Sequence, residues 1–205
     1  MNSKVRDVMT RDVVAVHLYT PFKDIARTLF DREISAVPVL DDSCHVTGIV
    51  CAADLVEQQA LGSASARPRV RSVSAQTLMT SPVVTVTADT DTATAARLMY
   101  RNAVKHLPVV SDTGRLVGIV SEKDLLTVFL RPDLDIQDEI VRTVILAEPE
   151  SRLSTMTVRV RDGIVLASGH AADEEPVRQA IEQIRAVDGV IEVIDRVEIG
   201  PVSVS

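Results

Sequence analysis

The residues with the clearest chemical potential are Ser121 and Asp124, three positions apart in the stretch SEKD. Ser-x-x-Asp at the start of a helix is a capping pattern, in which the hydroxyl accepts a hydrogen bond from an amide of the first turn and the carboxylate sits favourably in that positive turn. The same groups suit a nucleotide, because a carboxylate accepts from two ribose hydroxyls and a helix N-terminus attracts phosphate. Seventy residues earlier, the stretch CAAD has Cys51 in place of the serine and keeps Asp54. Capping explains Ser121 fully and Asp54 less well, so both interpretations stay open.

These two stretches belong to an internal repeat. Residues 9–56 align with residues 79–126 without a gap, and 16 of the 48 positions are identical. Each copy has a β-rich run, a helix with apolar residues at helical spacing, two short apolar runs around a polar turn, and a closing helix. We therefore predict two β-α-β-β-α units. Because three strands leave an apolar face uncovered, we expect the units to pack face to face about a pseudo-twofold axis.

A third segment follows the break RPD at 131–133. It begins with an amphipathic helical stretch and continues with alternating apolar and polar residues around Asp162-Gly163, a strong hairpin signal. A second helical stretch carries Pro176 near its first turn, and an alternating strand ends the segment. The predicted order is α-β-β-α-β in two layers, so the fold class of the whole chain is α+β.

The repeated unit resembles the CBS domain, through the dipeptide before its Pro-Val sequence and its G-I-V-x-x-x-D-L ending. Two tandem copies are similar to a Bateman module, a regulatory pair that binds adenine nucleotides (AMP, ADP or ATP) in signal transduction. The third segment resembles the BON domain, through DGIVLASGH and VDGVIEVIDRVEI. The expected boundaries are residues 4–61 for the first CBS repeat, 62–75 for a linker, 76–131 for the second repeat and 136–200 for the BON-like domain.

The CBS resemblance implies two clefts, each with its Ser or Thr and Asp from one repeat and its adenine-facing wall from the other. In the main cleft, Asp124 would hold the ribose, Ser121 the ribose or phosphate, and Lys105 and His106 the phosphates. A solvated Lys-His pair is the alternative for those two cations. The implied adenine wall consists of small or flat residues of the first repeat: Thr10, Ala15, Ile34, Ser35 and Ala36.

The second cleft would keep the carboxylate that binds ribose but lack the hydroxyl, so we expect it to bind weakly or to be empty. The dipeptide before its own Val37-Pro38 is Ser35-Ala36, which offers no cation. The residues implied for it are Cys51, Asp54, Thr80, Thr85 and Val104, together with the shared Lys105 and His106.

The BON resemblance implies contact with phospholipid, but the charge opposes it. Residues 133–205 carry 7 Arg, no Lys and 15 Asp/Glu, whereas residues 1–132 carry 15 Lys/Arg against 14 Asp/Glu. An acidic segment is repelled by anionic lipid and by nucleic acid. Contact with a protein partner or another ligand is therefore as well supported as membrane contact.

Several function classes are disfavoured by the composition. The chain has 3 Phe, 2 Tyr and no Trp, too few rings for a nucleic-acid stacking platform. No nucleophile-base pattern or Walker loop appears, so we expect no enzyme and no catalytic cofactor. Cys44, His45 and Cys51 lack the spacing of a zinc site, so we expect no metal. The N-terminus has no apolar run of signal-peptide length, which favours the cytoplasm.

The leading interpretation is a regulatory protein whose CBS pair senses an adenine nucleotide and signals through the BON-like domain or a partner. The resemblance also implies a homodimer formed through the CBS helices. The alternative is a ligand-free dimerisation scaffold or adaptor whose BON-like domain attaches to the envelope, to lipid or to a protein.

Overall fold

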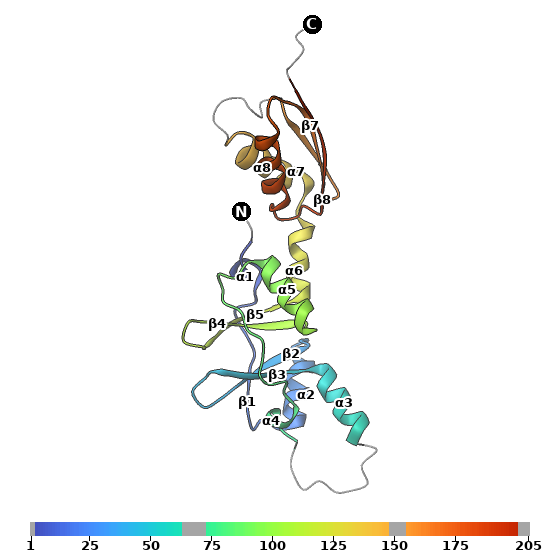
Figure 1. Ribbon diagram of the computed structural model, residues 1–205. Coiled ribbons are helices and arrows are strands. Elements are labelled where there is room, and N and C mark those ends of the chain that lie inside the picture. The colour runs from blue at the N-terminus through green and yellow to red at the C-terminus, as the bar shows by residue number, and fades with distance from the viewer. Residues whose placement is uncertain (1–2, 63–72, 148–154, 201–205) are drawn as a thin grey trace. The chain divides into compact units, whose positions relative to one another are not determined.

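The computed structural model of the protein describes residues 3–62, 73–147 and 155–200. The chain forms two compact units, one that spans Lys4–Leu125 and one that contains Leu126 and the residues after it (Figure 1). The linker predicted at 62–75 falls mostly on residues 63–72, which lie outside the described residues. The two predicted repeats therefore share one unit, and the third segment forms the other.

The first repeat is built on a three-stranded sheet. β1 (Val16–His17) pairs in parallel with β2 (Ala36–Leu40), and β2 pairs antiparallel with β3 (Val46–Cys51). α2 (Phe22–Asp31) connects β1 to β2, and α3 (Ala52–Gly62) follows β3. The apolar residues of the strands and of one face of each helix form a buried core: Val16, Ile25, Leu29, Val37, Val39, Val50 and Leu55, with Ala75.

The second repeat has the same pairing seventy residues later. β4 (His106–Val110) pairs antiparallel with β5 (Leu116–Ser121), between α5 (Thr92–Asn102) and α6 (Glu122–Leu126). The β-rich run before α5 contributes a single parallel bridge to β4, from Val86. The two β-rich runs thus form less strand than the sequence predicts, and Thr10 and Thr80, which precede them, pair with strands of the other repeat.

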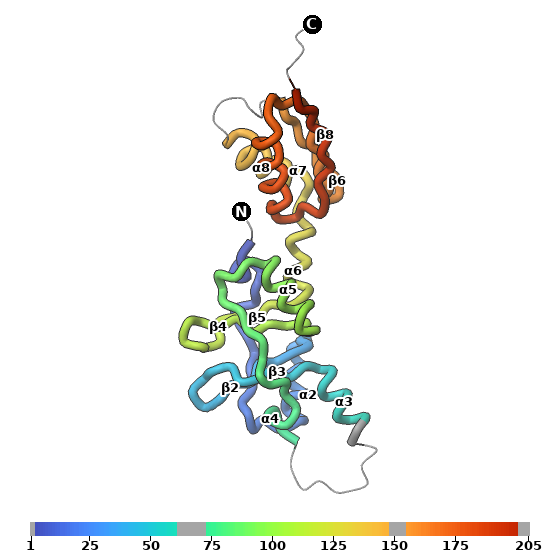
Figure 2. Tube along the Cα trace, viewed as in Figure 1, coloured from blue at the N-terminus to red at the C-terminus, as the bar shows by residue number. Residues whose placement is uncertain are grey.

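Two short helices are exchanged between the repeats. The amide of Val5, in α1 (Val5–Val8), donates to the carbonyl of Thr90, and Val5 is buried in the core of the second repeat. The amide of Ala75, in α4 (Ala75–Leu78), donates to the carbonyl of Thr20 in the first repeat. Figure 2 shows the blue N-terminal segment beside the green second repeat and the green α4 beside the blue first repeat. The exchange makes the two repeats one unit.

The second unit is a three-stranded sheet with two helices. Its sheet has the order β6 (Thr157–Arg161), β7 (Ile164–Ala171), β8 (Glu192–Ile199); β6 and β7 are antiparallel, and β7 and β8 are parallel. α7 (Asp133–Ile140) precedes the sheet, and α8 (Glu174–Arg185) connects β7 to β8. A 3-10 turn, η1 (Thr127–Leu130), precedes α7, and a π-helical turn, η2 (Val141–Ile145), continues it. Apolar residues of both helices, β6 and β7 form the buried core, and partly buried valines of β8 pack against it.

The β6–β7 hairpin turns at the dipeptide that predicts it. Asp162 and Gly163 have φ angles of 51° and 73°, which a two-residue turn between twisted strands requires. The carboxylate of Asp133, at the start of α7, accepts hydrogen bonds from both amides, at 2.8 and 3.0 Å. The order α-β-β-α-β and the α+β fold class are confirmed.

Candidate ligand-binding cleft

The cleft that the sequence implies is present as a cavity between the two repeats. It has a volume of about 300 Å³, near the lower end of the range for ligand pockets. Its walls come from the segment before β1, the loop before β2, the start of β4, and the junction of β5 and α6. The residues that line it are Thr10, Asp12, Val13, Val14, Glu33, Ile34, Ser35, Ala36, His106, Ile119, Ser121, Lys123 and Asp124.

Backbone pairing holds the first repeat against β5 on one side of this cavity. Thr10 and Ile119 exchange two backbone hydrogen bonds, each 2.9 Å long. Gly118 permits the close approach, since a Cβ atom there would lie 2.6 Å from Met9 Sδ and 3.1 Å from the Thr10 carbonyl oxygen. Thr80 and Ile49 form the equivalent pair, at 2.9 and 3.2 Å. The glycine of each G-I-V sequence is therefore required by the crossing of the repeats.

Ser121 and Asp124 form the reciprocal cap that their spacing predicts. Asp124 Oδ2 accepts from the Ser121 amide at 2.8 Å and from Ser121 Oγ at 2.7 Å. The Asp124 amide in turn donates to Ser121 Oγ at 3.4 Å. Both side chains are half-buried and line the cavity. One turn of chain thus places a hydroxyl, a carboxylate and a helix N-terminus at the cavity wall.

The first repeat keeps half of this arrangement. Asp54 Oδ2 accepts from the Cys51 amide at 2.7 Å. This bond gives Asp54 a structural role, which the sequence left open. Burial, with a smaller contribution from Asp54, raises the pKa of the Cys51 thiol to about 11, so the thiol stays protonated at neutral pH.

His106 joins the two repeats across the cavity. Its Nε2 lies 2.9 Å from Ser35 Oγ, and its Nδ1 is buried with no hydrogen-bond partner among the described residues. Burial lowers the pKa of His106, and Lys105 adds to this, although Glu122 and Asp124 act in the opposite direction. The ring is therefore neutral at pH 7 and brings no positive charge to the cavity.

Seven of the nine residues implied for the main cleft line this cavity. Ala15 and Lys105 are not among its lining residues. The sequence interpretation missed Asp12, Glu33 and Lys123, the three further charged residues of the lining. Lys123 lies inside the Ser-x-x-Asp motif, so its proximity was a signal; Asp12 and Glu33 carried none. The lining offers a carboxylate and hydroxyl for a sugar, a cation for an anionic group, and an apolar wall for a ring.

The residues implied for the second cleft lie at the positions of the CBS pair that are related by the repeat to the main cleft. Thr80 is bridged to β3, and Cys51 and Asp54 stand at its end. Thr85 precedes the bridging residue Val86, and the Val104 amide donates to the Met99 carbonyl at 3.0 Å after α5. The half-complete cap at Cys51 is one chemical difference between the two clefts.

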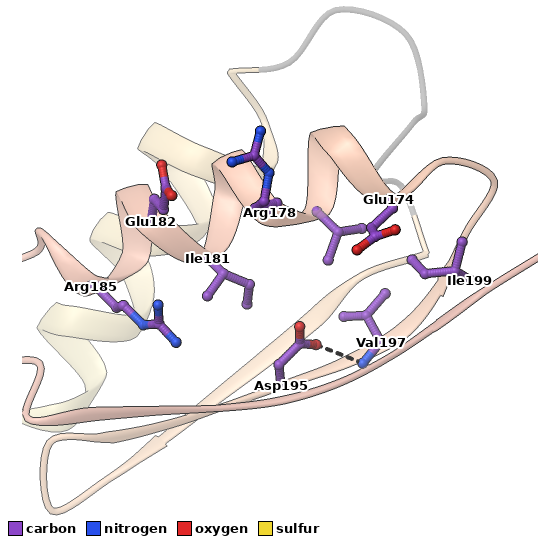
Figure 3. Close-up of a pocket in the computed structure, with 9 residues that line it drawn as sticks. Glu174, Arg178, Ile181, Glu182, Arg185, Asp195, Val197 and Ile199 are labelled. Carbon is purple, nitrogen blue, oxygen red and sulfur yellow. Dashed lines mark hydrogen bonds between the residues drawn. The ribbon is translucent and has the colours of Figure 1, made fainter.

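The second unit has a groove of its own, between α8 and the edge strand β8 (Figure 3). Its volume is about 310 Å³. Asp195 Oδ1 accepts from the Val197 amide at 2.9 Å and so occupies part of the strand edge. The groove is lined by apolar and oppositely charged side chains: Glu174, Val177, Arg178, Ile181, Glu182, Arg185, Asp195, Val197 and Ile199. Such a mixed lining does not indicate one ligand class.

Two further observations concern metals and membranes. Over 3–62, 73–147 and 155–200, no group of three or more His, Cys, Asp or Glu side chains is arranged to hold a metal ion. None of the helices in those ranges combines the length and the apolar character that crossing a bilayer requires. Cys44 and Cys51 are free cysteines.

The fold and the inter-repeat cavity define a tandem CBS pair followed by a small α+β domain. The chain belongs to the CBS domain family: the family model matches residues 5–60 and 70–131. The BON domain model matches residues 133–201. Both predicted resemblances are confirmed.

Several relatives and solved structures are similar to this chain over much of its length. An uncharacterised 17.7 kDa protein of Acidianus ambivalens is 29% identical over 130 residues, 63% of this chain and 75% of that protein. An inosine-5'-monophosphate dehydrogenase of Thermoplasma acidophilum is 29% identical over 182 residues, 87% of this chain but 35% of the dehydrogenase. The matched region is thus a minor part of that enzyme. The solved structure of CBSX2 in complex with AMP is 26% identical, with a TM-score of 0.56, over 62% of this chain and 96% of that one.

Proposed function

We propose that the protein is a non-enzymatic regulator whose CBS pair binds an adenine nucleotide in the cleft between the repeats. The observation that carries the proposal is the junction of β5 and α6, where Ser121 and Asp124 line a cavity completed by the other repeat. The AMP complex of CBSX2, a structure with the same fold, supports the choice of ligand.

Each group of the lining has a role in this proposal. Asp124 accepts hydrogen bonds from the ribose hydroxyls, and Ser121 and the first turn of α6 bind the ribose or phosphate. Ile34 and Ala36 pack on the adenine ring, and Thr10 closes that wall. Lys123 is a cation of the lining and takes the phosphate-binding role that the sequence gave to Lys105 and His106. The second cleft, which has Cys51 in place of the serine, binds the nucleotide weakly or not at all.

Binding would transmit a signal by ordering a cleft that both repeats build. A ligand that contacts both repeats stabilises the arrangement in which they are held together, and this shifts the population of states. The BON domain or a protein partner responds to that change in population. Cytoplasmic location and the lack of nucleic-acid partners stay predictions of the sequence.

We also propose that the protein is a homodimer formed through its CBS helices. Phe30 of α2 and Tyr100 of α5 occupy equivalent positions, and their relative exposures are 84% and 89%. Aromatic residues are enriched at protein interfaces, and these two occupy the same position in both repeats.

Calorimetric titration of the nucleotide-free protein tests the main proposal. The ligands are AMP, ADP, ATP, NAD and S-adenosylmethionine. One site per chain for at least one of them supports the sensor. Failure of all five contradicts it and favours the scaffold or adaptor, whose BON domain would then be tested by sedimentation with anionic and neutral liposomes.

A further inference from the structure

The inter-repeat cavity is lined by more acidic than basic side chains. This balance affects which adenosyl ligand the cavity accepts. Three carboxylates, those of Asp12, Glu33 and Asp124, face one ammonium group, that of Lys123. His106 adds no positive charge at neutral pH, because burial keeps it neutral. The lining is therefore net acidic, whereas a site for a polyphosphate chain concentrates cations.

Three of these four charged residues have no charged equivalent in the other repeat. The repeat places Pro82 opposite Asp12, Ala103 opposite Glu33 and Ala53 opposite Lys123. The equivalent positions on the other side are thus uncharged. Asp12, Glu33 and Lys123 distinguish this cavity, whereas the shared glycines, Pro-Val sequences and aspartates build the fold.

The two additional carboxylates, those of Asp12 and Glu33, are accessible to a ligand in the cavity. Asp12 and Glu33 are exposed residues of the cavity lining, and among the residues that the structure describes neither takes part in an ion pair. Glu33 also has a φ of 52°, a conformation that a non-glycine residue seldom adopts. Its equivalent, Ala103, shares this angle at 53°, so the backbone is set by the fold and the carboxylate is an addition.

We propose that this cleft selects adenosyl ligands with at most one phosphate group, such as AMP, and disfavours ATP. This rests on the proposed function, namely that the cleft binds an adenosyl compound at all. Lys123 balances a single phosphate, and each further phosphate meets Asp12 and Glu33 without a compensating cation. The cavity volume of about 300 Å³ also favours a small ligand.

Coulomb's law sets the size of the effect. Two like unit charges about 4 Å apart in water repel by an amount equivalent to about a fivefold loss of affinity. ATP carries about two more negative charges than AMP, so the expected preference for AMP is at least about tenfold. Because Asp12 and Glu33 are exposed, added salt should reduce the preference.

The test is a comparison of adenosine, AMP and magnesium-free ATP by calorimetry, at low and high salt, with the full chain. In the wild type we expect AMP to bind at least about tenfold more tightly than ATP. The double variant Asp12→Asn, Glu33→Gln keeps the size of both side chains, and its ATP affinity should rise by about tenfold with adenosine unchanged. Lys123→Gln should weaken AMP and leave adenosine unchanged. Thermal unfolding midpoints check that the variants are folded.

The outcomes separate the two proposals. ATP binding as tight as AMP binding in the wild type, or an ATP-to-AMP ratio unchanged in the double variant, overturns the selectivity and leaves the nucleotide sensor intact. Failure of adenosine, AMP and ATP alike overturns the selectivity, and failure of ADP, NAD and S-adenosylmethionine as well refutes adenosyl binding itself.

Discussion

Ser121 Oγ lies 2.7 Å from Asp124 Oδ2, and this bond joins the last residue of β5 to the first turn of α6. The amide of Ser121 donates to the same carboxylate oxygen at 2.8 Å. In the first repeat only the amide bond remains, from Cys51 to Asp54. Both repeats thus have the capping carboxylate, and only the second repeat has the hydroxyl.

This asymmetry predicts opposite stability effects for two single-atom changes. Ser121→Ala removes a cap and should lower the free energy of unfolding by about 1 kcal/mol. Cys51→Ser supplies the missing hydroxyl beside Asp54 and should raise it, because the carboxylate is already placed to accept. Urea denaturation of the two variants measures both effects. A stabilised Ser121→Ala variant would contradict the capping role.

His106 predicts a dependence of stability on pH. Its pKa in the folded protein lies below the ordinary value of about 6.5, so the unfolded chain takes up a proton at a higher pH than the folded chain does. The free energy of unfolding should therefore fall as the pH drops below about 6.5, and His106→Gln should reduce that slope. Exposed His17→Gln is the matched control. Equal slopes in the wild type and in His106→Gln would contradict the assignment.

The sequence predicted the fold because its signals are local. The seventy-residue register, the Asp162-Gly163 turn and the helical spacing of Val177, Ile181 and Ile184 depend on neighbours in the chain, and the structure confirms each. The Ser121–Asp124 cap was predictable for the same reason.

The charged lining of the cleft was harder to predict, because it depends on contacts between distant parts of the chain. Asp12 reaches the cavity since α1 crosses to the second repeat and the Thr10–Ile119 bridge holds the following residues there. No pattern in the sequence near Asp12 or Glu33 indicates that crossing. The sequence interpretation placed Lys105 in the cleft, whereas Lys123 and not Lys105 is among the lining residues.

A pair of glycines in the BON domain tests its packing. Gly169 has a φ of 138°, and a Cβ atom there would lie 2.2 Å from the Thr155 carbonyl oxygen. Gly169→Ala should therefore destabilise this domain by about 2 kcal/mol or more. Gly200 has a φ of 153° and open space around it, so Gly200→Ala should cost less. Hydrogen exchange of residues 155–200 measures the difference; equal protection in the two variants would contradict this packing.

If the protein is a dimer through its CBS helices, substitution of two helix residues should change its oligomeric state. Phe30→Ser together with Tyr100→Ser should shift the protein towards a monomer, because both rings would be buried in the interface. Analytical ultracentrifugation over a range of concentrations measures this shift. Tyr19→Ser, an exposed residue outside the helices, is the control. A monomeric wild type at all concentrations would contradict the dimer.

The role of Asp124 in the cleft is tested by the calorimetric affinity of Asp124→Ala and Asp54→Ala for AMP. Each variant loses an equivalent backbone cap, so the pair separates ligand binding from stability. The account predicts a loss of at least about tenfold for Asp124→Ala, from the lost charge-assisted hydrogen bonds to ribose, and almost no loss for Asp54→Ala. Equal losses in the two variants, or unchanged binding by Asp124→Ala, would contradict the assignment of the site.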